Sequence, residues 1–136
     1  MAVLTDEVRA LLERRNFAHL ATLMPDGSPH SIAVWVLLDG EEILLGTADR
    51  TRKARNIARD GRVALSITDH EHPYRTAVIR GRASIRADED HVVMNRLARK
   101  YTGADFPFPG GPGRIAIAIT PEHATYMELP FSYTPG

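Results

Sequence analysis

The amino-acid sequence predicts one α+β domain, a mainly antiparallel β-barrel of six to seven strands with about three peripheral helices. Short segments rich in β-branched and aromatic residues recur along the chain, and tight-turn sequences such as Asp39-Gly40 separate them. These connections are too short for parallel crossovers, which need a dozen residues or more. A chain of 136 residues is long enough for one compact domain, 1–136, and not for two.

The first half of the chain is expected to form a helix followed by an antiparallel meander. Thr5 can cap a helix that ends near Asn16, because its hydroxyl can accept from a free N–H of the first turn. Turn sequences at 25–29 and 39–40 then divide the segment that follows. The expected strands are 17–24, 30–38 and 42–48.

The second half predicts two more helices and the remaining strands. Residues 49–60 should form a helix with Ala54, Ile57 and Ala58 facing inward, and Asp88 should cap a third helix that runs to Tyr101. Gly81 should mark a bulge or bend in its strand. The expected strands are 62–69, 75–86, 114–120 and 122–129, and a Gly/Pro-rich loop occupies 102–113.

Two alanines in the segment 114–120 alternate with isoleucines. Small side chains on one face of a strand indicate that another surface packs closely there. In a chain this small, pairing with a second copy would bury more apolar area, so this face contributes to the expectation of a homodimer.

Composition excludes several classes of function. The chain has no cysteine, so thiolate nucleophiles, disulfides, iron–sulfur clusters and thiolate zinc sites are excluded. Its formal net charge is zero, so no global field recruits nucleic acid or an anionic membrane. We expect a cytoplasmic protein, since neither a secretion signal nor an apolar run of membrane-spanning length is evident.

The most informative segment runs from residue 46 to residue 57, where a strand is expected to end and a helix to begin. Four cations and the Thr51 hydroxyl lie within six residues: Arg50, Arg52, Lys53 and Arg55. A helix start exposes unpaired N–H groups and a positive dipole end, so cations there are unfavourable unless an anion binds. The alternative is a solvated basic helix face, paired in part with Asp49 or Asp60. Both interpretations stay open at this point.

No catalytic residue can be assigned from the sequence, which has no Ser/His/Asp order, P-loop or dinucleotide fingerprint. His70-Glu71-His72 lacks a third ligand, so no metal site is predicted. Tyr101, Tyr126 and Tyr133 are candidate proton donors.

Several segments, taken in order, resemble the pyridoxamine-phosphate-oxidase-like, FMN-binding split-barrel proteins. The resemblance covers nearly the whole chain, and within that family it is narrower for the reductases that depend on the deazaflavin coenzyme F420. The segments are Leu20-Ala21-Thr22-Leu23, Asp26-Gly27-x-Pro29, Ala33-Val34-Trp35-Val36, Asp39-Gly40, Thr51-x-Lys53-x-x-Asn56-Ile57, Asp60-x-Arg62-Val63 and Gly81-Arg82-Ala83.

The resemblance implies a homodimeric split barrel with two cofactor sites at the subunit interface. It places the cofactor's phosphate at the start of the second helix and its ring against strand backbone, and it brings the turn into strand 75–86 to the cofactor. By position, the phosphate residues would be Arg50, Thr51, Arg52, Lys53 and Asn56. The ring would be lined by Ala33, Val34, Trp35, Gly46, Thr47 and Ala48, and approached by Tyr74, Arg75, Thr76 and Ala77.

The function implied is that of an F420-dependent oxidoreductase, which transfers hydride to or from a small unsaturated organic substrate. Pyridoxamine phosphate oxidases carry a basic signature on the second strand, whereas residues 32–38 contain neither Arg nor Lys. That departure argues against vitamin B6 oxidation and weakens the case for tight FMN binding. The alternatives that remain are an FMN-dependent oxidoreductase, a non-catalytic flavin or deazaflavin carrier, and a dimeric interaction module.

Overall fold

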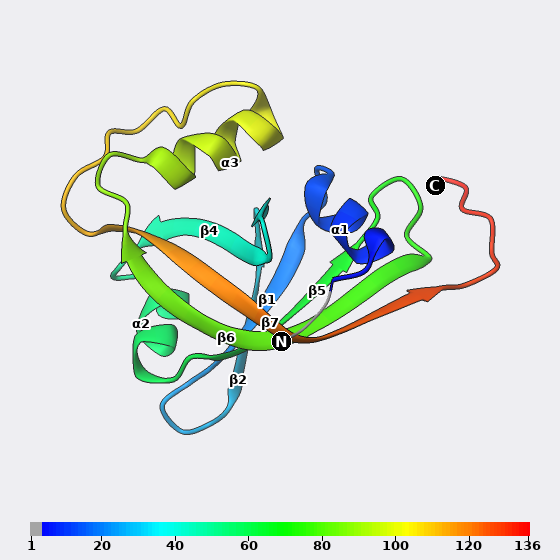
Figure 1. Ribbon diagram of the computed structural model, residues 1–136, viewed down its shortest axis with the longest axis horizontal. Helices are drawn as coiled ribbons and strands as arrows, with labels where there is room; N and C mark the ends of the chain where they lie inside the picture. Colours follow the sequence, from blue (N-terminus) through cyan, green and yellow to red (C-terminus); the bar gives the residue numbers. More distant parts are fainter. Residues whose placement is uncertain (1–3) are drawn as a thin grey trace.

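The computed structural model describes residues 4–136, which form one seven-stranded antiparallel sheet and three helices (Figure 1). The predicted α+β class is therefore confirmed. The helices are α1 (Asp6–Glu13), α2 (Arg52–Arg59) and α3 (Val92–Thr102). The strands are β1 (Ala18–Leu23), β2 (Pro29–Val34), β3 (Leu37–Asp39), β4 (Glu42–Ala48), β5 (Arg62–Thr68), β6 (Arg75–Ala87) and β7 (Arg114–Glu128). No helix among the described residues is long and apolar enough to cross a membrane.

The sheet closes on itself at the link between β2 and β3. The strand order is β2-β1-β5-β6-β7-β4-β3, so these two strands lie at opposite edges although only Trp35 and Val36 separate them along the chain. The prediction of one strand over 30–38 is therefore wrong. Its first part pairs with β1 and its last part pairs with β4. This change of partner within two residues converts the sheet into a split barrel.

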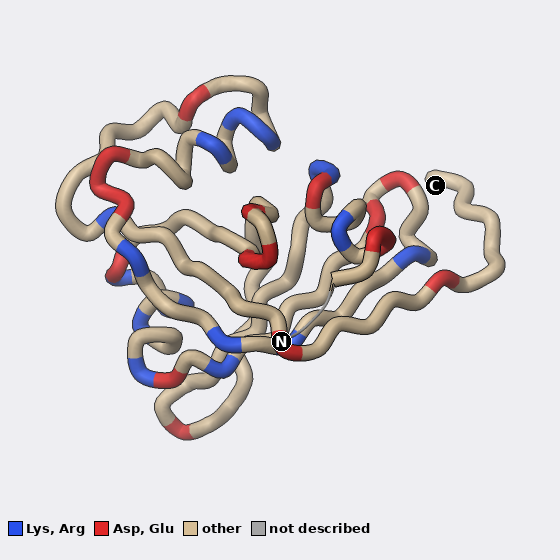
Figure 2. The backbone as a smooth tube through the Cα atoms, in the orientation of Figure 1, with Lys and Arg blue, Asp and Glu red and all other residues tan. Residues whose placement is uncertain are grey.

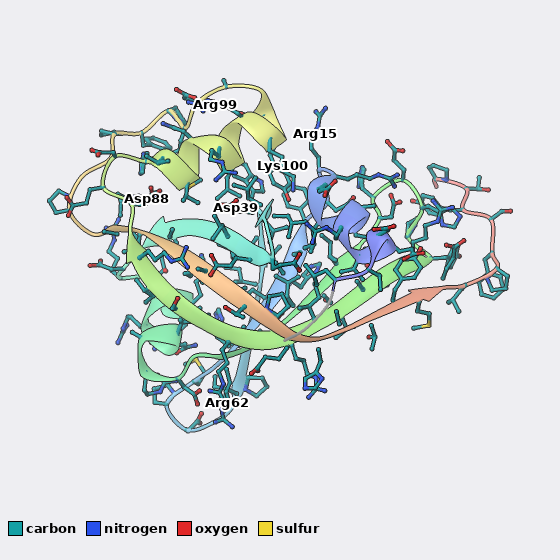
Figure 3. All side chains as sticks on the ribbon, viewed as in Figure 1. Arg15, Asp39, Arg62, Asp88, Arg99 and Lys100 are labelled. Atoms are coloured by element: carbon teal, nitrogen blue, oxygen red, sulfur yellow. The ribbon has the colours of Figure 1, made fainter. Side chains whose placement is uncertain are left out.

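The link between β2 and β3 is fastened by two side chains at the end of α3. The Val36 N–H donates to the Tyr101 hydroxyl at 3.1 Å, and the Lys100 ammonium donates to the Val36 carbonyl at 2.7 Å. Lys100 also donates to the Leu12 carbonyl at 2.5 Å, which joins the end of α1 to the same point. Figure 3 shows Lys100 directed from α3 toward α1. Burial lowers the pKa of Lys100 to about 8.

A bulge lies in the long β6–β7 pair. Arg80 is opposite His123 and Gly81 is opposite Pro121, so Glu122 is the extra residue on β7. The predicted bulge at Gly81 is confirmed, and a Cβ there would lie 2.2 Å from the Thr120 carbonyl oxygen. The two strands predicted at 114–120 and 122–129 are one bent strand, because the bulge accommodates Pro121, which has no N–H to donate.

The helices begin and pack differently from the prediction in two places. Ala58 of α2 is exposed, and Asn56 is buried instead beside Ala54 and Ile57. Helix α3 begins at Val92, four residues after Asp88, because the intervening turn winds back toward the carboxylate. The Asp88 carboxylate still caps the helix, since it accepts from two N–H groups of the first turn at 3.0 and 3.1 Å.

Helix α3 packs on β4, the strand that pairs with the alanines of β7. Ala116 and Ala118 are buried and pair with Gly46 and Leu44 of β4, and α3 packs on this outer face (Figure 1). A Cβ on Gly46 would lie 2.7 Å from the Met94 sulfur. Ala116 and Ala118 are already buried within the single chain, beside the part of β4 that α3 covers. These alanines therefore give no support to a homodimer.

Candidate functional site

A pocket of about 280 Å³ opens where the β2–β3 link meets β4, α2 and α3. Four of its residues were predicted to line a ring, and Lys53 was predicted to hold a phosphate, so the fold brings both predicted groups together. The lining residues are Phe17, Ala33, Val34, Trp35, Leu45, Gly46, Lys53, Met94 and Leu97. Apart from Lys53, the side chains that line the pocket are apolar, and such a lining suits a planar ring.

Aromatic rings form one side of the pocket. Trp35 stacks on Tyr101 with centroids 5.2 Å apart and planes 5° apart, and the Phe17 ring lies 5.8 Å from Tyr101. Phe17 is 55% exposed, although large apolar residues are usually covered. An exposed aromatic at the rim of an apolar pocket can contact a planar ligand.

The Tyr101 hydroxyl has a structural role. It donates to the Asn16 carbonyl at 2.6 Å while it accepts from Val36. Burial raises the pKa of Tyr101, which keeps the hydroxyl protonated for that donation. Tyr101 was one of three candidate proton donors, and its hydroxyl is already bonded to backbone partners.

The start of α2 has free N–H groups and no side-chain cap. The Thr51 hydroxyl donates to the Ala48 carbonyl at 2.9 Å and lies 3.1 Å from the Thr47 hydroxyl, so it accepts nothing from the first turn of the helix. By contrast, Thr5 caps α1 and Asp88 caps α3. The buried Thr47 and Ala48 shape the turn into α2 and do not line the pocket.

The cations at the start of α2 make no ion pairs within residues 4–136. Asp60 pairs with Arg62 at 2.8 Å, and Asp49 pairs with none of the cations at the start of α2. The alternative of a partly paired basic face therefore finds no partner among the described residues. Figure 2 shows the basic positions gathered along α2. The unpaired cations of this segment are Arg50, Arg52, Lys53 and Arg55.

Lys53 differs from the exposed arginines around it. Its side chain is half-buried at the pocket, whereas Arg50 and Arg55 are exposed. Burial lowers the pKa of Lys53, and the positive charge of Arg114 lowers it further. A bound anion would offset both effects, so the phosphate position predicted for this residue is chemically suitable.

Asn56, which was predicted to lie at the phosphate, is buried inside the barrel in the single chain. The side chain is 0% exposed and donates to the Thr22 hydroxyl at 3.0 Å, so it joins α2 to β1 inside the barrel. Its amide oxygen is buried without a hydrogen-bond partner among the described atoms. The spacing along the sequence could not reveal that Asn56 is buried. Residues three apart in a helix lie close to the same face, yet Asn56 faces inward and Lys53 faces the pocket.

The residues from Tyr74 to Ala77 lie away from the small pocket. They begin β6 at the far end of the sheet from α2 (Figure 1), and none of them lines that pocket. Tyr74 packs against Phe131, Thr76 is half-buried and Ala77 is buried in the core. Within one chain, the predicted site residues therefore lie in two separate places, one at the Lys53 pocket and one at residues 74–77.

Arg75 lines a larger pocket of about 950 Å³, between the end of α1, the β5–β6 turn and Lys100. The buried Asp69 organises this turn, since its carboxylate accepts from two backbone N–H groups and pairs with Arg14 at 3.1 Å. His70 and His72 line the same pocket, but the described residues contain no group of three or more potential metal ligands.

Sequence reasoning missed four contributors to the small pocket and one neighbouring cation. Phe17, Leu45, Met94 and Leu97 line the pocket, and Arg114 lies close enough to perturb Lys53. One feature of the sequence could have drawn attention to Arg114: it is a cation directly after a Gly/Pro-rich loop. In the structure it begins the strand that pairs with β4. The other four are ordinary apolar residues in sequence.

Comparisons with known proteins identify the family of the chain. The family model described as pyridoxamine 5'-phosphate oxidase matches residues 4–128. An F420H(2)-dependent biliverdin reductase of Mycobacterium tuberculosis (strain CDC 1551 / Oshkosh) is 33% identical over 120 residues, which are 85% of this chain and 82% of that protein.

Solved structures with the same fold are also similar to this chain. A structure named F420 reductase superposes with a TM-score of 0.79 at 32% identity, covering 86% of this chain and 94% of that one. A conserved hypothetical protein, Rv2991 of Mycobacterium tuberculosis, has a TM-score of 0.77 at 25% identity, covering 98% and 94%. The chain therefore belongs to the pyridoxamine 5'-phosphate oxidase-like split-barrel family.

Proposed function

We propose that this chain is an oxidoreductase that uses coenzyme F420 to transfer hydride to or from a small unsaturated organic substrate. The observation that carries the proposal is the juxtaposition of an apolar pocket with an uncapped helix start and a half-buried, unpaired Lys53. Relatives named as F420-dependent reductases support the choice of cofactor.

The residues present fit a phosphate-bearing deazaflavin. The ring would lie against Ala33–Trp35 and Gly46, whose strand backbone can hydrogen-bond its polar edge. The phosphate would lie at the start of α2, where Thr51 and Lys53 are available. When bound, the cofactor would supply the hydride chemistry, and the protein would bind, orient and exclude water. No side chain need act as a nucleophile.

FMN remains the alternative cofactor, because it also carries a ring and a phosphate. A carrier that binds either cofactor without turnover is the non-enzymatic alternative. The basic stripe favours the deazaflavin, since the glutamates beyond its phosphate add negative charge. Arg52, Arg55 and Arg59 follow one another at helical spacing along α2.

We also propose that the chain acts as a homodimer in the cytoplasm, with the cofactor between two copies. Val78 and Met127 are 46% and 57% exposed on the outer face of the β6–β7 pair, where their neighbours Ala77 and Ile79 point into the core. A second copy would cover this apolar face. It would also allow Tyr74–Ala77 of one chain to approach the cofactor of the other, which one chain alone does not permit.

Replacing Lys53 with Ala should weaken F420 binding by about 1.5–3 kcal/mol, the range for hydrogen bonds to charged groups. The affinity of the wild type should also fall as salt rises. Trp35 is the single tryptophan of the chain and lines the pocket, so quenching of its fluorescence can report binding.

Arg96→Ala is the matched control for charge. Arg96 lies on α3, pairs with Asp39 at 3.4 Å and lines neither pocket, so its loss should leave the affinity unchanged. If wild type and Lys53→Ala bind F420 with equal affinity, the basic segment is only a solvated helix face and not a phosphate site.

The affinity for F420 should exceed the affinity for FMN and should rise as the glutamate tail lengthens. Arg55 and Arg59 are exposed and Arg52 is partly exposed, so each added contact is modest and sensitive to salt. Equilibrium titrations at low and moderate salt measure the difference. Equal or tighter binding of FMN would move the assignment to the flavin branch and leave the phosphate site intact.

Light scattering at micromolar concentration should give twice the chain mass of 15.1 kDa. Val78→Asp should shift the population toward monomer while circular dichroism stays unchanged, because the side chain is exposed in a single chain. A wild type that is monomeric under these conditions contradicts the homodimer.

A further inference from the structure

We infer that Arg114, held in place by His91, is a second cation for the cofactor's phosphate beside Lys53. The inference rests on the proposed function and extends it to two residues outside the predicted set. In this arrangement Arg114 contacts the ligand and His91 is a positioning residue.

Arg114 belongs to a different element from Lys53 but lies at the same turn. It is the first residue of β7 and lies opposite Ala48, the last residue of β4, so α2 begins close by at Arg52. This strand pairing sets Arg114 at the turn into α2, and its positive charge contributes to the lowered pKa of Lys53. Asp49 lies beside Gly113, but it makes no ion pair with Arg114.

The guanidinium of Arg114 is fixed through one nitrogen only. Its Nε donates to Nε2 of His91 at 2.8 Å, and its Cζ lies 5.7 Å from the centroid of the Phe106 ring. Within residues 4–136, neither terminal nitrogen of Arg114 has a hydrogen-bond partner or a carboxylate. The planar fork that binds phosphate through two parallel hydrogen bonds is therefore oriented and free.

His91 is itself rigidly held. It is 4% exposed, and its ring packs edge-on to Phe106 at 5.5 Å. Among the described residues it is the one non-glycine with positive φ, at 57°. The Asp88 N–H also donates to the Arg114 carbonyl at 2.9 Å, so this turn holds both the backbone and the side chain of Arg114. Strained, over-determined positions of this kind cluster at functional sites.

The test compares two ligands, of which only one carries the phosphate and the acidic tail beyond it; F420 with a single glutamate is used to keep that tail short. F420 and its phosphate-free precursor, the same ring with a ribityl chain, are titrated against Trp35 fluorescence. Arg114→Met keeps an unbranched apolar side chain of similar length and removes the guanidinium that lies over Phe106 and carries the charge. We expect it to weaken F420 binding tenfold or more and to leave the phosphate-free ligand within twofold. His91→Ala should give a smaller loss with the same selectivity, Arg114→Lys should restore part of the affinity, and Arg96→Met should change neither ligand.

Unchanged F420 affinity in Arg114→Met overturns the inference, and so does an equal loss for both ligands, which is the sign of a structural role only. If the wild type prefers FMN, the same variants are titrated with FMN and riboflavin. If the wild type binds neither cofactor, the proposed function fails and inorganic phosphate decides the inference. Thermal stabilisation by phosphate that Arg114→Met abolishes then supports it, and equal stabilisation of both proteins overturns it.

Discussion

Val36 lies where the barrel closes, and both of its backbone polar groups are bonded to side chains from the end of α3. The residue is 0% exposed, and the chain changes edge here, so neither neighbouring strand can supply the partners. A buried N–H or C=O left unpaired would cost about 1–3 kcal/mol. Tyr101 and Lys100 remove that cost, and the Tyr101 ring also backs Trp35 at the pocket. Closure of the barrel and the shape of the pocket therefore depend on the same two side chains.

The electrostatics of the site follow from where this closure places α2 and β7. The chain has no net charge, yet it gathers unpaired cations at one helix start, where the fold leaves the first N–H groups without a cap. Lys53 comes from the helix and Arg114 from the first residue of β7. Lys53 brings its charge to the pocket, and Arg114 lies opposite Ala48 at the end of the strand that leads into α2. An anion attached to a planar ring would match both the apolar pocket and the cation beside it. Half-burial of Lys53 strengthens the local field, because less solvent screens it.

Local signals in the sequence predicted most of the elements. Thr5 capping α1, the Asp39-Gly40 hairpin and the bulge at Gly81 depend on neighbours in sequence or on backbone sterics, and all three are present. The break at Trp35–Val36 was not predictable in the same way, because Val36 is held by Tyr101 and Lys100, which lie 65 and 64 positions away in the sequence. The burial of Asn56 depends on Thr22 across the barrel, and the position of Arg114 depends on strand pairing with β4. Contacts between segments that are distant in sequence determine these three features. The pocket residues that hydrophobic periodicity could not identify were predicted from the resemblance to a family.

Amide hydrogen exchange at Val36 tests most directly whether the hydrogen bonds from Tyr101 and Lys100 of α3 hold the barrel and its pocket together. The account predicts a slowly exchanging Val36 amide in the wild type. It predicts exchange at least about tenfold faster in Tyr101→Phe, since loss of one hydrogen bond of more than about 1.4 kcal/mol corresponds to that factor. Amides in the core of β5 should keep their protection in the same variant, which separates local opening from global unfolding. An unchanged exchange rate at Val36 in Tyr101→Phe would contradict the account.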